Sequence, residues 1–246
     1  MRERGHALYR DQGIVLRGIK LGEADRILSV LTQNHGRIRV VAKGVRKSRS
    51  RFGGRIDTFT HVDLQLYPGR ELDGITQAEI IKRYPRLRSD YRAFTAASAM
   101  ADAVERTTPE RERNVRLFVL LRSGLQALED GAADPALLAY AFLAKAASVA
   151  GVHPMLDACT GCGGPDTVAL SFSGGGVVCG SCAQRSDPRV STPITDAWTS
   201  LLTDDWDTLR AGSLEAPVQR ELSGLLLAFV QWQLDNRFRA FGLIGT

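Results

Sequence analysis

The chain has 246 residues, of which 44% are hydrophobic and 24% are charged. This composition is ordinary for a globular protein and excludes a chain that is disordered throughout. The charged residues 1–6 are followed by no apolar signal segment, and the longest apolar stretch, 222–230, is too short to span a membrane. We therefore expect a soluble cytoplasmic protein that does not enter a membrane.

The net charge of +5 is divided unevenly along the chain. Residues 1–92 contain 20 Lys/Arg and 10 Asp/Glu, a net charge of +10, whereas residues 93–246 contain 12 and 17, a net charge of −5. This asymmetry predicts a surface for a polyanion in the N-terminal part. A basic surface that only helps solubility is the plainer alternative.

The first 85 residues have the pattern of short strands separated by glycine turns. Apolar and polar residues alternate, so that Arg37 and Arg39 face one way while Ile38 and Val40 face the other. Five strands of this length indicate a small barrel, and an OB-fold fits, although an SH3-like barrel fits almost as well. The segment 73–81 is equally compatible with the start of a helix. The expected strands are 13–21, 26–32, 37–43, 58–67 and 73–81.

The hydrophobic period becomes helical after Pro85. Asp134 and Pro135 have the pattern of an N-cap followed by proline in the first turn, and Gly131 lies where a helix should end. We predict an α+β protein with an OB-fold domain over 1–84 and an all-α domain over 85–246, interrupted at about 155–190. The expected helices are 91–104, 115–128, 137–150, 195–202 and 213–239.

Four cysteines form two C-x2-C pairs separated by sixteen residues: Cys159, Cys162, Cys179 and Cys182. This spacing is typical of a zinc ribbon, in which four thiolates close a tetrahedron and leave no position for substrate. The intervening segments 168–172 and 177–178 predict a hairpin with glycines 174–176 at its turn. We expect one structural zinc ion, and a redox dithiol is the weaker alternative.

The cysteine segment carries little charge. Residues 155–184 contain Asp157 and Asp166 but no Lys or Arg. A finger that contacts DNA needs basic residues, so we interpret this element as a structural staple of the helical domain.

The candidate DNA-binding residues are eight cations within nineteen residues that include no acidic residue: Arg37, Arg39, Lys43, Arg46, Lys47, Arg49, Arg51 and Arg55. A mobile, glycine- and serine-rich loop of this kind follows a phosphate backbone without reading bases. Phe52 or Phe59 would be placed to stack on a base, but the core is the better assignment for Phe59. The alternative for the whole segment is a solvated linker.

Motifs of common enzymes are absent from the sequence, including the P-loop and the H-E-x-x-H and G-x-S-x-G patterns. The histidines are scattered, and His61 alternates on a strand as a structural residue does. The local acidic group Asp204, Asp205 and Asp207 is explained by a helix N-terminus. We therefore expect no catalytic residues.

Several segments in this order resemble the RecO family of bacterial recombination mediators. They are YRDQGIVL (9–16), LGEADRIL (21–28), AKGVR (42–46), SRFGG (50–54), GREL (69–72) and QWQL (231–234), together with the four-cysteine site. The resemblance covers nearly the whole chain and is most specific over the first 80 residues.

The resemblance implies an OB-fold, a helical C-terminal domain, and a role in the RecF-type repair pathway. It implies binding to single- and double-stranded DNA, strand annealing, and partnership with RecR and single-stranded-DNA-binding protein, so that RecA is loaded onto coated DNA near the nucleoid. Three alternatives stay open on the residues alone: a zinc-containing RNA-binding module, an unrecognised metal-dependent nuclease, and a scaffold whose basic segment binds an acidic protein tail.

Overall fold

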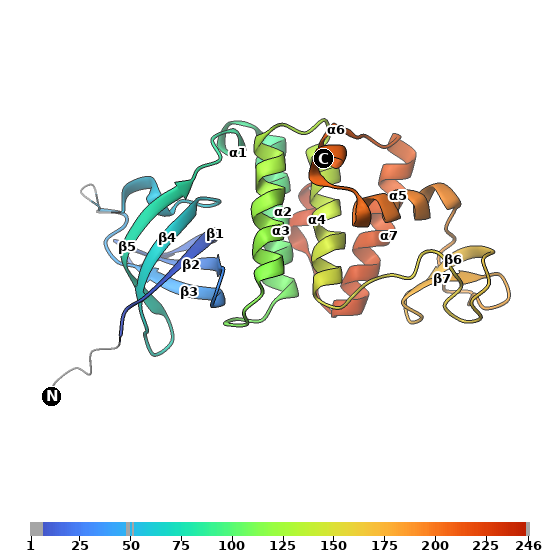
Figure 1. Cartoon of the computed structure of the whole chain (residues 1–246), viewed down its shortest axis with the longest axis horizontal. Coiled ribbons are helices and arrows are strands. Elements are labelled where there is room, and N and C mark those ends of the chain that lie inside the picture. Colours follow the sequence, from blue (N-terminus) through green and yellow to red (C-terminus); the bar gives the residue numbers. More distant parts are fainter. Residues whose placement is uncertain (1–6, 48–49, 51, 245–246) are drawn as a thin grey trace.

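A computed structural model describes residues 7–47, 50 and 52–244. The barrel lies at one end of an elongated molecule, the helices form the middle, and a small hairpin lies at the far end (Figure 1). In the described part of the chain, no helix is long and apolar enough to cross a membrane.

The N-terminal strands close into a barrel in the order β1-β2-β3-β5-β4. Neighbouring strands are antiparallel except β3 and β5, which form a short parallel pair. This topology is that of an OB-fold, so the OB-fold prediction is confirmed and the segment 73–81 is a strand. The strands are β1 (Tyr9–Leu21), β2 (Asp25–Thr32), β3 (Gly36–Ala42), β4 (His61–Tyr67) and β5 (Asp73–Lys82).

The middle of β1, residues 13–16, is buried on both faces because it joins the barrel to the helices, whereas residues 17–21 are exposed. Val15 lies in the barrel interior, while Ile14 and Leu16 belong to the hydrophobic cluster of the helical part. The β1–β2 register shifts between Val15 and Arg17, which marks a bulge. Such a bulge bends the strand and redirects its side chains.

The helical body is built around α4 (Pro135–Val149), of which eleven of fifteen residues are buried. The side chain of Asp134 accepts a hydrogen bond from the Ala136 amide, and Gly131 adopts a φ of 93° after the preceding helix, so both predicted helix boundaries are confirmed. The surrounding helices are α1 (Arg86–Ser89), α2 (Tyr91–Thr107), α3 (Val115–Glu129), α5 (Thr192–Thr203), α6 (Trp206–Ala211) and α7 (Ala216–Leu234).

The last predicted helix, 213–239, is too long. The helix α7 ends at Leu234, where Asp235 takes a left-handed conformation with φ 46°, and a short 3-10 helix η2 (Arg239–Leu243) follows. The left-handed residue breaks the helical hydrogen bonding and reverses the chain direction. The prediction failed because no glycine or proline marks this stop.

Polar contacts lock the barrel to the loop between α2 and α3. The buried carboxylate of Asp73 accepts hydrogen bonds from Arg111 at 2.9 Å and from the Tyr9 hydroxyl at 2.5 Å. Burial alone would raise the pKa of Asp73, but the bonds from Arg111 and Tyr9 outweigh it, and the net shift is downward. The ionised carboxylate is therefore part of the folded junction.

The cysteine segment contains the predicted hairpin, made of β6 (Thr167–Ser171) and β7 (Gly176–Cys179). Leu170 and Val177 belong to the main hydrophobic cluster. The ring of Phe172 contacts Phe229 of α7 edge-on at 6.0 Å. This packing against α7 is what a structural staple requires.

Candidate metal site and nucleic-acid interface

The four cysteine sulfurs converge between the hairpin and the preceding loop. All four Sγ atoms lie within 4.8 Å of one another, and the cysteines form no disulfide. The Sγ atoms of Cys162 and Cys179 are 3.8 Å apart. A tetrahedral ion with metal–sulfur bonds of about 2.3 Å requires sulfurs roughly 3.8 Å apart, which is the separation of this pair, so the four sulfurs are grouped closely enough to hold a metal ion.

The electrostatics of these thiols also favour a cation. The amide of Cys179 donates to the Cys159 Sγ at 3.2 Å and lowers the pKa of that thiol to about 6. Hydrogen bonding to Cys179 raises the pKa of Cys182 to about 12. Four thiolates at this separation repel one another, so full deprotonation needs a positive ion among them. An ion at this point would have protein ligands at all four positions of its tetrahedron, which is the arrangement of a structural metal site.

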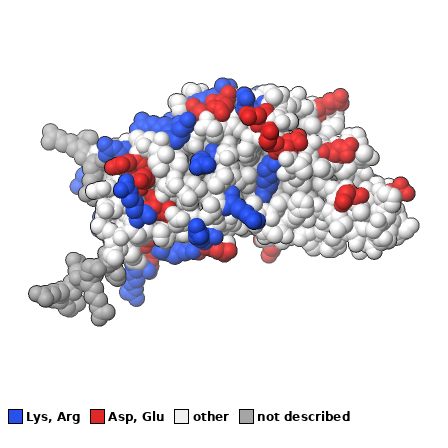
Figure 2. Space-filling view, viewed as in Figure 1, with Lys and Arg blue, Asp and Glu red and all other residues white. Residues whose placement is uncertain are grey.

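Charge is distributed as the sequence predicts. Figure 2 shows Lys and Arg side chains gathered over the barrel and the neighbouring helices, whereas the hairpin end is mostly uncharged with scattered acidic residues. Residues 155–184, which contain the metal element, include no Lys or Arg to contact a phosphate backbone.

The two arginines on β3 point outward as expected, but they differ in their surroundings. The side chain of Arg37 is only 14% exposed, donates to the Thr108 carbonyl oxygen at 3.3 Å and forms an ion pair with Glu110 at 3.2 Å. Arg39 is exposed, and among the described residues nothing forms a hydrogen bond or ion pair with its guanidinium. Arg39 is therefore free to bind an anion, whereas Arg37 already joins the barrel to the helical part.

The segment after β3 forms a turn that is tied to the β1–β2 loop in its described residues. The amide of Arg46 donates to the Ala24 carbonyl oxygen at 2.9 Å, and the amide of Gly44 donates to Asp25 at 2.7 Å. Lys43, Arg46 and Lys47 are nevertheless exposed. Residues 43–47 thus form a hydrogen-bonded turn that presents three cations, and the mobility of the segment stays a prediction.

Arg55 lies in η1 (Gly53–Ile56), a 3-10 helix between β3 and β4. Arg55 is exposed there. Arg49 and Arg51 lie outside the described residues, so their role stays a prediction.

The aromatic residues of this region do not face solvent. Phe52 and Phe59 are both buried, Phe52 in the barrel interior and Phe59 against Phe94 of α2 at 5.6 Å. The core assignment of Phe59 is confirmed, and the idea that Phe52 stacks on a base is wrong, because its ring fills the barrel.

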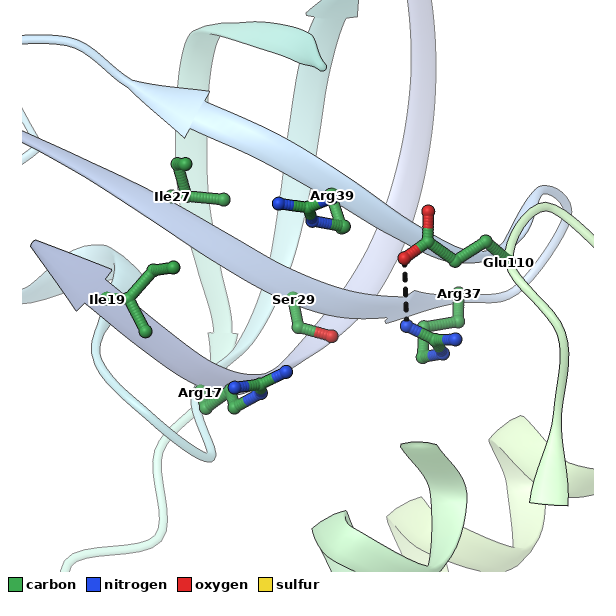
Figure 3. A pocket seen from close by; sticks show the side chains of 7 residues that line it. All are labelled: Arg17, Ile19, Ile27, Ser29, Arg37, Arg39 and Glu110. Carbon is green, nitrogen blue, oxygen red and sulfur yellow. Dashed lines mark hydrogen bonds and ion pairs between the residues drawn. The ribbon is translucent and has the colours of Figure 1, made fainter. Parts of the chain in front are cut away.

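Sequence reasoning missed a surface pocket of about 210 Å³ that opens beside Arg39. Figure 3 shows its side chains converging from β1, β2, β3 and the loop between α2 and α3. No sequence motif indicates the pocket, because its lining residues come together only when the three strands pair. They are Arg17, Ile19, Ile27, Ser29, Arg37, Arg39 and Glu110.

His61 has a structural environment, as predicted. Its side chain is buried where the barrel meets α3, its ring lies 5.7 Å from that of Phe118, and its Nε2 lies 3.0 Å from the Gln12 Oε1. Burial, helped by the positive charge of Arg122, lowers the pKa of His61 to about 4. The imidazole is therefore neutral near pH 7.

The fold and the site define an OB-fold protein with an α-helical body and a four-cysteine metal element. The sequence matches the family profile described as Recombination protein O N terminal over residues 6–84, and the profile described as Recombination protein O C terminal over residues 88–240. The chain therefore belongs to the RecO family of DNA repair proteins.

Similar proteins cover almost the same length. A DNA repair protein RecO of Frankia casuarinae is 46% identical over 238 residues, which are 95% of this chain and 96% of that protein. The DNA repair protein RecO of Thermobifida fusca is 41% identical over 244 residues, which are 97% of this chain and 98% of that protein. That of Streptomyces griseus is 41% identical over 244 residues, which are 95% of this chain and 97% of that protein. The resemblance noted in the sequence is thus confirmed.

Proposed function

We propose that this chain is a non-enzymatic recombination mediator that binds single- and double-stranded DNA through the outer face of its barrel. The observation that carries the proposal is the group of exposed cations on and after β3, which includes Arg39, Lys43, Arg46 and Lys47. Membership of a DNA repair family supports DNA as the polyanion for this surface.

The mechanism follows from polyelectrolyte physics. Two DNA strands repel each other, and cations that contact the phosphates release condensed counterions and lower that repulsion. A strand held by its phosphates keeps its bases free, so a second, complementary strand pairs with it. Duplex formation is downhill, and annealing on this surface therefore needs no nucleotide hydrolysis.

The partners and the metal belong to the same proposal. We infer RecR and single-stranded-DNA-binding protein as protein partners, RecA as the protein loaded onto DNA in consequence, and the cytoplasm beside the nucleoid as the location. The metal is zinc, because four thiolates in a closed tetrahedron are a typical structural zinc site.

Salt-dependent binding to a labelled single strand tests the DNA interface. A variant with Arg39, Lys43, Arg46 and Lys47 changed to Ala should lose affinity, and its slope of log K against log salt should fall by about 3, since each lost phosphate contact removes roughly 0.7 on single strands. The control changes four exposed arginines of the helical part to Ala and so removes equal charge: Arg185, Arg189, Arg220 and Arg237. An unchanged slope in the first variant would move the interface elsewhere.

A further inference from the structure

The pocket beside Arg39 is built from two cross-strand rows on the outer face of the barrel. In the first row, Ser29 of β2 pairs with Arg17 of β1 on one side and with Arg39 of β3 on the other. In the second row, Ile19 pairs with Ile27. Neighbouring strands lie about 4.8 Å apart, so the two arginines flank a central hydroxyl at a separation that one small anion bridges.

The charges around the pocket leave one positive charge in excess. Arg17 forms an ion pair with Glu105 of α2 at 2.7 Å, and Arg37 forms one with Glu110 at 3.2 Å. Arg39 has no such partner among the described residues. An anion with a single negative charge therefore balances the site, and a phosphodiester group carries one.

The hydroxyl of Ser29 supplies an independent sign of a ligand. Ser29 is 6% exposed, and within the described chain its Oγ has no hydrogen-bond partner. Buried hydroxyl groups are almost always bonded, so an unpaired one needs an explanation. In Figure 3 the hydroxyl points into the space between the arginine side chains, where an anion oxygen would accept its hydrogen bond.

The second row gives the pocket an apolar side. Ile19 is 48% exposed although its side chain is aliphatic, and Ile27 lines the same space. A free inorganic anion gains nothing from these side chains, whereas the sugar and base edge of a nucleotide bury apolar surface against them.

We propose that this pocket is a subsite for one nucleotide of single-stranded DNA, with its phosphate between Arg17 and Arg39, hydrogen-bonded by Ser29, and its sugar and base edge against Ile19 and Ile27. The inference rests on the proposed function. DNA fits better than an acidic peptide because the exposed Lys43 follows the end of β3, about 13 Å from Arg39, so that a strand whose phosphate lies at Arg39 passes a second cation further along.

Binding of fluorescein-labelled (dT)12 to the full chain, followed by anisotropy at several salt concentrations, tests the subsite. Arg39→Ala should weaken binding about fivefold and reduce the salt slope by roughly 0.7, the value for one phosphate on a single strand. Ser29→Ala should weaken binding about fivefold with an unchanged slope, because a neutral hydrogen bond is lost. Ser29→Thr, which keeps the hydroxyl, should bind as the wild type does.

Arg10 offers a matched control for Arg17. Both lie on β1, both form an ion pair with a carboxylate, and their side chains are 66% and 63% exposed. Arg10→Ala should bind (dT)12 like the wild type, whereas Arg17→Ala should resemble Arg39→Ala. Ile19→Ala should weaken binding of (dT)12 more than binding of an abasic strand with the same number of phosphates, because the abasic strand keeps the sugar but lacks the base edge.

The outcomes separate the subsite from the broader function. If the wild type binds with a steep salt slope while the Ser29, Arg17 and Arg39 variants match Arg10→Ala, the subsite is refuted and DNA binding stands. If the wild type itself shows no salt-dependent binding, the proposed function fails first. Tighter binding of an acidic peptide than of (dT)12, with the same dependence on Ser29, would assign the pocket to a protein and overturn the proposal.

Discussion

Mild acid should weaken the contact between the barrel and the helices through His61. The imidazole is 4% exposed, and its pKa lies near 4 in the folded protein against about 6.5 in an unfolded chain. Between these values the unfolded state binds more protons than the folded state. The stabilising effect is therefore complete above pH 6.5 and is lost as the pH falls toward 4.

The size of the effect follows from the two pKa values. Each pKa unit corresponds to about 1.4 kcal/mol, so the whole shift is worth roughly 3 kcal/mol. Linkage between pH 7.5 and pH 5.0 gives a loss of about 2 kcal/mol from this residue alone. Protonation would also place a second positive charge near Arg122, which faces the same side chain.

Urea unfolding at pH 7.5 and pH 5.0 measures this loss. The comparison uses wild type and His61→Gln, whose side chain does not titrate, so that contributions from other groups, the thiols included, cancel. The wild type should lose about 2 kcal/mol more than the variant on acidification. His153→Gln, which changes an exposed histidine, should keep the wild-type pH dependence. Equal pH dependence in wild type and His61→Gln would refute the assignment of a buried neutral imidazole.

Three further substitutions test the site and the fold. Cys162→Ser should abolish stoichiometric metal in elemental analysis and lower the free energy of unfolding by about 3 kcal/mol or more. Wild-type stability in this variant would show that the segment folds without metal. Gly36→Ala should destabilise the protein by more than about 2 kcal/mol in urea unfolding, because Gly36 has a φ of +67° and the new Cβ would lie 2.0 Å from the Glu112 carbonyl oxygen. Gly22→Ala is the control. Gly22 has a φ of +58° but no atom lies within 4 Å of the new Cβ, so this change should lower the free energy of unfolding by less. Asp134→Ala removes the N-cap of α4 and should cost about 1 kcal/mol in the same assay, whereas no loss would show that the cap is dispensable.

The sequence predicted the features that depend on short-range pattern. The alternation of apolar and polar residues correctly predicted that Ile38 and Val40 are buried and that Arg39 is exposed. The spacing of the cysteines correctly predicted that the four sulfurs lie together. The acidic group near Asp205 was interpreted as a helix N-terminus, and the Asp205 side chain caps α6 by accepting from the Thr208 amide. These signals are local, so a single sequence carries them.

Features that depend on strand register were not predictable. Ser29 lies beside Arg17 and Arg39 only because β2 pairs with β1 and β3 in one particular alignment, and a shift of one residue would turn the hydroxyl to the opposite face. The ion pair that occupies Arg37 depends on a loop far along the chain. The six-residue helix α6 is too short to show a helical period, so the acidic group indicated its N-terminus but no residue pattern indicated its span.

The parallel seam that closes the barrel has a consequence for how the protein unfolds. Only two residue pairs join β3 to β5, Val40 with Asp73 and Val41 with Gly74. Asp73 is held in turn by Arg111, which follows α2. Asp73 therefore takes part both in closing the barrel and in docking the helices. We expect the amide hydrogens of the β3–β5 pair to exchange with solvent together with those at the start of α3. The two regions then open as one cooperative unit rather than as separable halves.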